Sequence, residues 1–184
     1  MEMKKLFKLV CLGALGFLLL GGIVFVNTDA DARSPKQQAS VKIINSKGEE
    51  IGTARITQKP DSVHIHIEAK DLPPGIHGIH FHETGKCEAP DFTSAGAHLN
   101  PQGKQHGFNN PQGFHAGDLL NIQVGQDGTV KADLESKSVT LVTGLSNSLR
   151  KPGGTAIVIH EKEDDYVTDP SGNSGNRIAC GPIL

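Results

Sequence analysis

The 184-residue chain has no tryptophan, one tyrosine and only 4% aromatic residues. This scarcity argues against an aromatic-rich binding surface. Lysine and arginine number 18 against 20 acidic residues, for a formal net charge of −2. Because nucleic-acid-binding domains normally carry a basic patch or stripe, we predict no nucleic-acid partner. The chain also lacks Gly-x-Ser-x-Gly, His-Glu-x-x-His and phosphate-binding-loop motifs, so those enzyme classes have no support.

The first 32 residues have the pattern of an export signal. Basic residues precede an apolar run at residues 9–26, and Ala30-Asp31-Ala32 offers the small residues of a cleavage site. The run is also nearly long enough to span a bilayer as an uncleaved anchor. We therefore expect residues 1–32 to be a signal peptide or a membrane anchor, residues 33–39 a polar linker, and residues 40–184 one domain. This domain would lie outside the cytoplasm, either secreted or attached to the outer face of the membrane.

If the domain is exported, its few cysteines can form a disulfide. The chain has three, and the two outside the leader are Cys87 and Cys180, each beside turn-forming residues. Two cysteines allow one intramolecular pairing, which an oxidising compartment permits. We expect a disulfide between them; the alternative is two free buried thiols.

No segment shows a helical period of useful length, and the rest of the chain has the pattern of β-structure. Short runs rich in β-forming residues alternate with turns that contain glycine. Ser62–Glu68 alternates apolar and polar residues, as a half-buried strand does. The pattern predicts an all-β sandwich or barrel of about eight strands. The predicted strands are residues 41–44, 51–57, 63–69, 77–82, 120–124, 129–134, 139–142, 156–160 and 177–180.

Two long segments interrupt the pattern of short turns. Glu83–Gly117 and Glu161–Asn176 are rich in glycine, asparagine, proline and aspartate, and each follows a predicted strand that ends in histidine. Long loops in a compact domain are usually functional or disordered. Because the first segment itself contains three further histidines, we expect both loops to be functional.

Histidine is abundant, with nine residues in the chain. His80 and His82 are two apart, so on a strand both imidazoles point to the same face. Imidazole suits copper and zinc, and a zinc site normally takes four ligands. The chain offers too many candidates for one ion, which predicts two neighbouring metals. The candidates are His80, His82, His98, His106, His115, Asp118 and His160.

Six segments resemble the signatures of the copper/zinc superoxide dismutases. They are Gly75–Glu83 (GIHGIHFHE), Gly96–Pro101 (GAHLNP), His106-Gly107, His115–Leu119 (HAGDL), Ile159–Asp165 (IHEKEDD) and Gly172–Gly181 (GNSGNRIACG). The segments occur in the family's order, and the resemblance covers roughly residues 40–184. It implies an eight-stranded Greek-key β-barrel whose two long loops hold the metals on its outside.

The resemblance also assigns the ligands. It implies copper bound by His80, His82, His98 and His160, and zinc bound by His98, His106, His115 and Asp118. In this arrangement His98 bridges the two ions as an imidazolate. It further implies that Arg177 docks the anionic substrate, that Asp164 hydrogen-bonds one ligand of each metal, and that Cys87 and Cys180 form the family's disulfide.

The implied activity is disproportionation of superoxide to dioxygen and hydrogen peroxide. Copper would cycle between two oxidation states, and zinc would mainly order the loop. In the family, the bridging histidine, here His98, would release copper on reduction and carry one of the protons, a role that suits the easily shifted proton affinity of imidazole.

Two alternatives keep the same scaffold without turnover: a copper-handling envelope protein, and a relative that has lost copper and keeps zinc. Such a relative should lack a copper ligand or Arg177, and the chain has all of them, so we favour the active dismutase. The sequence is compatible with a monomer or a homodimer. His64 and His66 belong to no motif of the family and share a strand face, either as a third metal site or as solvent-facing residues. His77 is expected to fasten a loop by hydrogen bonds.

Overall fold

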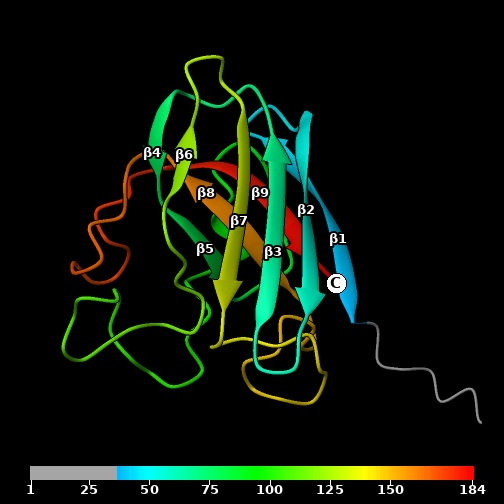
Figure 1. Ribbon diagram of the computed structural model, residues 1–184, viewed down its shortest axis with the longest axis vertical. Helices are drawn as coiled ribbons and strands as arrows, with labels where there is room; N and C mark the ends of the chain where they lie inside the picture. The colour runs from blue at the N-terminus through cyan, green and yellow to red at the C-terminus, as the bar shows by residue number, and fades with distance from the viewer. Residues whose placement is uncertain (1–36) are drawn as a thin grey trace, which may run out of the picture. The chain divides into compact units, whose positions relative to one another are not determined.

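Strands dominate residues 37–184, the part of the chain that the computed structural model describes (Figure 1). The predicted signal peptide or anchor and the first residues of the predicted linker lie outside the described residues. The only helix among residues 37–184 is a 3-10 turn, η1 (Thr93–Ala95). The strands are β1 (Gln38–Asn45), β2 (Glu50–Gln58), β3 (Val63–Ala69), β4 (Gly75–His77), β5 (Ile79–His82), β6 (Ile122–Val124), β7 (Val130–Ser136), β8 (Thr155–His160) and β9 (Arg177–Ile183).

Seven of these strands form one curled sheet, in the order β5-β8-β9-β1-β2-β3-β7, and β4 pairs separately with β6. All of these pairings are antiparallel. Figure 1 shows β7, β3 and β2 in front of β8 and β9, so that the sheet encloses a core. The chain leaves β3 for β4 and returns through β6 to β7, which lies beside β3. This is a Greek-key connection, and it confirms the predicted all-β barrel.

The core follows from alternation along the strands. In β3, Val63, Ile65 and Ile67 are buried while His64 and Glu68 are exposed. The inward side chains of the other strands meet them in one large apolar cluster. The predicted period-two pattern therefore determines which face of each strand lies inside.

Strands β5 and β8 differ because every residue in them is buried. Their inner faces join the main cluster. On the outer face, Ala156 and Val158 of β8 pack with Phe92, Ala95 and Cys180 in a second, smaller cluster. Burying a phenylalanine side chain contributes about 1.5–3 kcal/mol, so fully buried Phe92 holds the first long loop against the outside of the barrel.

The predicted strand at residues 77–82 is divided into two strands at Gly78. The backbone N–H of Gly78 donates to the carbonyl of Lys162, and the Gly78 carbonyl accepts from the N–H of His160. These bonds direct the chain away from β6, the partner of β4, and toward β8, the partner of β5.

The predicted strand at residues 139–142 was wrong. Val139 and Leu141 are buried, which produces the alternation of a strand. However, the backbone at Thr140 bonds to Asn147 and Leu149 in the same loop and to no neighbouring strand. At the other end of the domain, β1 begins at Gln38, before the predicted linker ends, because Ala39 already lies against the core.

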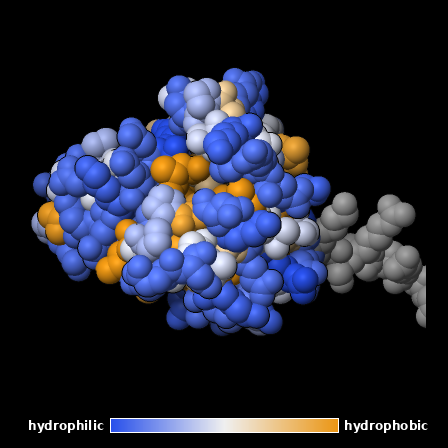
Figure 2. Space-filling model, turned by 90° about the horizontal axis from the view of Figure 1, so that it is seen from above, coloured by the Kyte–Doolittle hydropathy of each residue, from blue (hydrophilic) through white to orange (hydrophobic). Residues whose placement is uncertain are grey.

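The visible surface is mostly hydrophilic, and the hydrophobic residues on the face shown in Figure 2 form small separate groups. Among residues 37–184, no helix is both long enough and apolar enough to cross a membrane.

Candidate metal centre

Strand β5 is the base of the centre. Ile79 and Phe81 point into the barrel core, so His80 and His82 point to the opposite, outer face. His160, the last residue of the neighbouring strand β8, brings its Nε2 to 3.4 Å from Nε2 of His82. The sheet alone therefore gathers three imidazoles.

The first long loop adds ligands by running along β5. The N–H of Phe81 donates to Gly117 O (2.8 Å), and Phe81 O accepts from the N–H of Leu99 (2.8 Å). A side chain at position 117 would overlap the Phe81 carbonyl, so this close approach requires glycine. Two isolated antiparallel β-bridges accompany these hydrogen bonds. They pair the backbone of His80 with that of Asp118, and the backbone of His82 with that of His98.

Four histidines form the first set of donor atoms. One ring nitrogen from each lies within 4.8 Å of the others, and all four residues are buried: His80, His82, His98 and His160. His80 Nδ1 and His98 Nε2 have no hydrogen-bond partner. An unsatisfied buried polar atom costs about 1–3 kcal/mol. A metal ion bound by both lone pairs removes that cost, so the residues fit such an ion.

The second set converges on one carboxylate oxygen. Asp118 Oδ1 lies 3.0 Å from His98 Nδ1, 3.1 Å from His106 Nδ1 and 3.4 Å from His115 Nδ1. The donor atoms that lie within 4.8 Å of one another belong to His80, His98, His106 and Asp118. His115 adjoins them, with its Nδ1 3.3 Å from His98 Nδ1. His98 thus presents Nδ1 to this set and Nε2 to the first.

Asp164 connects the two sets from the second long loop. Its fully buried side chain accepts from His80 Nε2 at Oδ2 (2.7 Å) and lies 3.0 Å from His106 Nε2 at Oδ1. Asn121 holds the backbone of Asp164 through two hydrogen bonds of 2.9 and 3.0 Å. The position of Asp164 was predicted from the sequence, whereas Asn121 was not, because its residue type and position carry no recognisable signal.

Burial keeps the first set neutral. It lowers the pKa of His80 to about 4 and, with added repulsion from neighbouring imidazoles, the pKa values of His98 and His160 to about 3. Burial also holds the pKa of His82 well below its ordinary value. These rings are uncharged near pH 7, and neutral imidazole is the form that binds metals.

The pKa of His106 is shifted in the opposite direction. Burial by itself would lower its pKa, but hydrogen bonds to Asp118 and Asp164 raise that pKa to about 9. Although burial opposes it, the same bonds hold the pKa of both carboxyl groups well below the usual range. The carboxylates therefore favour positive charge in the second set, which is the condition that a bound cation needs.

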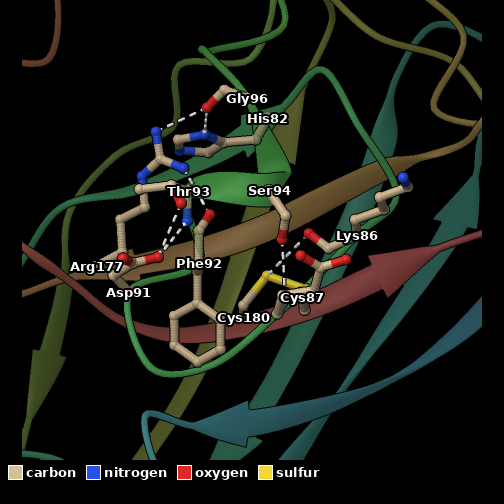
Figure 3. The surroundings of a disulfide bond; sticks show 11 residues. His82, Lys86, Cys87, Asp91, Phe92, Thr93, Ser94, Gly96, Arg177 and Cys180 are labelled. Atoms are coloured by element: carbon tan, nitrogen blue, oxygen red, sulfur yellow. Dashed lines mark hydrogen bonds between the residues drawn. A yellow bond between two sulfur atoms is a disulfide. The ribbon is translucent and has the colours of Figure 1, made fainter.

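Arg177, the first residue of β9, is fixed beside the first set (Figure 3). Its Nη1 donates to Phe92 O (2.6 Å), and its Nη2 donates to Gly96 O (2.7 Å). His82 Nδ1 donates to the same Gly96 oxygen (2.9 Å), which leaves His82 Nε2 free for a metal. Arg177 borders a cavity of about 430 Å³ whose other residues are Pro90, Asp91, Thr93, Gly175 and Asn176.

The predicted disulfide between Cys87 and Cys180 is confirmed. It ties the segment that contains Phe92 and Gly96 to β9, the strand that begins with Arg177 (Figure 3). The disulfide therefore connects the loop that carries the two carbonyl acceptors to the strand that carries the arginine.

The two long loops also support each other on one side of the barrel (Figure 1). The N–H of His106 donates to Asp169 Oδ1 (2.6 Å), and the N–H of Asn109 donates to Tyr166 O (2.9 Å). His77 fastens the same region as predicted, with its ring nitrogens 2.8 Å from the carbonyl oxygens of His160 and Pro73.

Residues 50–183 match the family model described as copper/zinc superoxide dismutase (SODC). The chain belongs to the copper/zinc superoxide dismutase family. It is 51% identical over 142 residues to superoxide dismutase [Cu-Zn] 1 of Aquifex aeolicus, covering 77% of this chain and 84% of that protein. A superoxide dismutase-like protein of Bacillus subtilis is 46% identical over 146 residues, covering 78% of this chain and 74% of that protein.

Solved structures of family members have the same fold. A SOD-like protein from Bacillus subtilis superposes with a TM-score of 0.76 at 45% identity, covering 79% of this chain and 97% of that one. The Cu/Zn superoxide dismutase of Brucella abortus gives a TM-score of 0.66 at 27% identity, covering 80% and 99%. As a copper/zinc superoxide dismutase, the protein is an oxidoreductase that acts on superoxide and uses copper and zinc.

Proposed function

We propose that the first donor set binds copper, that the second binds zinc, and that the protein disproportionates superoxide outside the cytoplasm. Copper would be held by His80, His82, His98 and His160, and zinc by His98, His106, His115 and Asp118. The observation that carries this assignment is the placement of His98. Its Nδ1 lies 3.0 Å from Asp118, while its buried Nε2 has no partner and belongs to the set of four histidines.

The assignment of His80 to copper alone rests on Asp164. His80 Nε2 is occupied by its hydrogen bond to that carboxylate, and only Nδ1 is free. The carboxylate fixes the tautomer of His80 and, through the opposite oxygen, the orientation of His106. Such outer hydrogen bonds typically change metal affinity by about 10–100-fold when they are removed.

Copper, when bound, supplies the one-electron chemistry that oxidises one superoxide to dioxygen and reduces another to hydrogen peroxide. Arg177 would bind the anion, since its charge is permanent and two carbonyls fix its direction. Because the net charge of the chain is −2, attraction of superoxide must come from such a local positive group. When it does not bind copper, His98 would hold a proton at Nε2, the nitrogen that makes no hydrogen bond within the protein.

An extracytoplasmic location is supported by the disulfide and by the export pattern of the first 32 residues. Secretion and membrane attachment through residues 9–26 are both consistent with this location. All proposed ligands come from one chain, so the centre is complete in a monomer and equally in each subunit of a homodimer.

The test is metal analysis combined with a superoxide assay on the full chain. The loaded protein should contain one copper and one zinc and should remove superoxide. His160→Ala should keep zinc and lose both copper and activity, because His160 belongs only to the first set. Lys47→Ala is the control, since Lys47 is an exposed turn residue outside both sets. Full activity in copper-free protein, or in His160→Ala, would overturn the proposal.

A further inference from the structure

Two histidines of β3 lie on the outside of the barrel and take no part in the metal centre. The side chains of His64 and His66 are 50% and 36% exposed, whereas Val63, Ile65 and Ile67 between and beside them are buried. The two imidazoles therefore share the solvent-facing side of one strand.

The neighbouring strand β7 places a carboxylate opposite each of them. His64 is paired in register with Glu135, and His66 with Asp133. His64 Nε2 lies 3.7 Å from Glu135 Oε2, and His66 Nδ1 lies 2.6 Å from Asp133 Oδ1. Two imidazole–carboxylate pairs therefore lie next to each other across β3 and β7.

Unlike the two buried sets, the donor atoms of this cluster do not converge on one point as they stand, so the side chains must turn to bind a single ion. Residues two apart on a strand are separated by roughly 6.6 Å along it. Within this protein, His80 and His82 of β5 have the same spacing, and their ring nitrogens lie within the 4.8 Å of one donor set. Two imidazoles at this spacing on an exposed strand can likewise turn toward a common point.

We propose that His64 and His66, together with Asp133 or Glu135, form a second, solvent-exposed site for Cu²⁺. Among divalent first-row metals, Cu²⁺ has the highest affinity for such nitrogen and oxygen ligands, and it prefers a tetragonal arrangement that two imidazoles and carboxylate oxygen supply. The surface position makes the bound ion exchangeable with free copper in solution.

Neighbouring groups limit the affinity of this site. His66 Nε2 lies 3.2 Å from Glu68 Oε1, which also accepts from Lys131 Nζ (2.7 Å). Arg55 of β2 is paired in register with His66 on its other side. A copper ion must replace the hydrogen bonds of His66 and approach these two cations, so the site is weaker than the buried centre.

The test uses protein already loaded with copper and zinc. Titration with further Cu²⁺, followed by equilibrium dialysis and electron paramagnetic resonance, should show one additional ion per chain with two imidazole nitrogens as ligands. His64→Gln and His66→Gln should each weaken this binding roughly tenfold or more, because each removes a direct ligand. Asp61→Asn, a change of an exposed carboxylate outside the cluster, is the matched control and should have no effect.

The dismutase activity and the content of the two resident metals should stay unchanged in both glutamine variants, which shows that they are folded. Absence of an additional ion at millimolar Cu²⁺ would overturn the proposal. So would additional copper that binds equally well to the double variant His64→Gln/His66→Gln.

Discussion

Removal of the disulfide should destabilise the domain strongly and disturb Arg177, the proposed substrate-binding group. The change is the double substitution Cys87→Ala/Cys180→Ala. Alanine is preferred to serine because Cys180 is fully buried, and an unpaired buried hydroxyl would add a cost of about 1–3 kcal/mol. Cys11, the third cysteine, is replaced by serine in both the parent and the variant, so that no thiol can exchange.

The magnitude follows from the length of the closed loop. The two cysteines are 93 residues apart in sequence. In the chain-entropy relation, a loop of this length gives about 4.6 kcal/mol of stabilisation at 25 °C. Domains have unfolding free energies of about 5–15 kcal/mol. The variant should therefore lose between a third and nearly all of the stability of the metal-free domain.

The second effect is on catalysis. The disulfide fixes the segment whose carbonyls at Phe92 and Gly96 accept from Arg177. Without the disulfide, Arg177 should spend less time in the orientation that these two hydrogen bonds fix, which is the one proposed to bind superoxide. We expect a lower kcat/KM in metal-loaded variant that keeps both metals.

The assay is urea unfolding of the metal-free parent and variant, followed by superoxide removal by the metal-loaded forms. Metal-free protein is needed because metals bound only by the folded state would mask the difference. A loss of less than about 1 kcal/mol would refute the loop-entropy reasoning, since strain rarely cancels so large a term. An unchanged kcat/KM would refute the inference that the disulfide helps to position Arg177.

Three further predictions concern single residues. Asp164→Asn should lower the affinity for both metals by about 10–100-fold in a competition titration; equal affinity would exclude its orienting role. Gly172→Ala should lower zinc content and thermal stability, because Gly172 has a φ of 62° and an added Cβ would overlap the Asp164 carboxylate; a variant with normal zinc content would contradict this. Hydrogen bonds to Asp133 and Glu68 raise the pKa of His66 above 6.5, so its contribution to stability is present below pH 6.5 and lost as the pH rises through the raised value. In an NMR titration Asp133→Asn should move this pKa back toward 6.5, and no movement would refute the assigned cause.

Alternation along the sequence predicted most of the sheet, because a strand with one buried face must alternate. The same rule failed at residues 139–142, where Val139 and Leu141 are buried without a partner strand. Burial alone produced that pattern, and only the partner backbone distinguishes a strand from a loop. The break at Gly78 was missed for the same reason, since its cause is a bond to Lys162 far along the chain.

The proposed ligands were predictable because their chemistry resides in side chains, whereas the groups that orient them are largely backbone atoms. Gly96 O accepts from both His82 and Arg177, so one carbonyl positions a proposed copper ligand and the proposed substrate-binding group together. A carbonyl is present at every residue and leaves no mark in the sequence. Its position depends on burial of Phe92 and on the disulfide. The small outer cluster of the fold therefore determines the geometry of the site as directly as the ligands do.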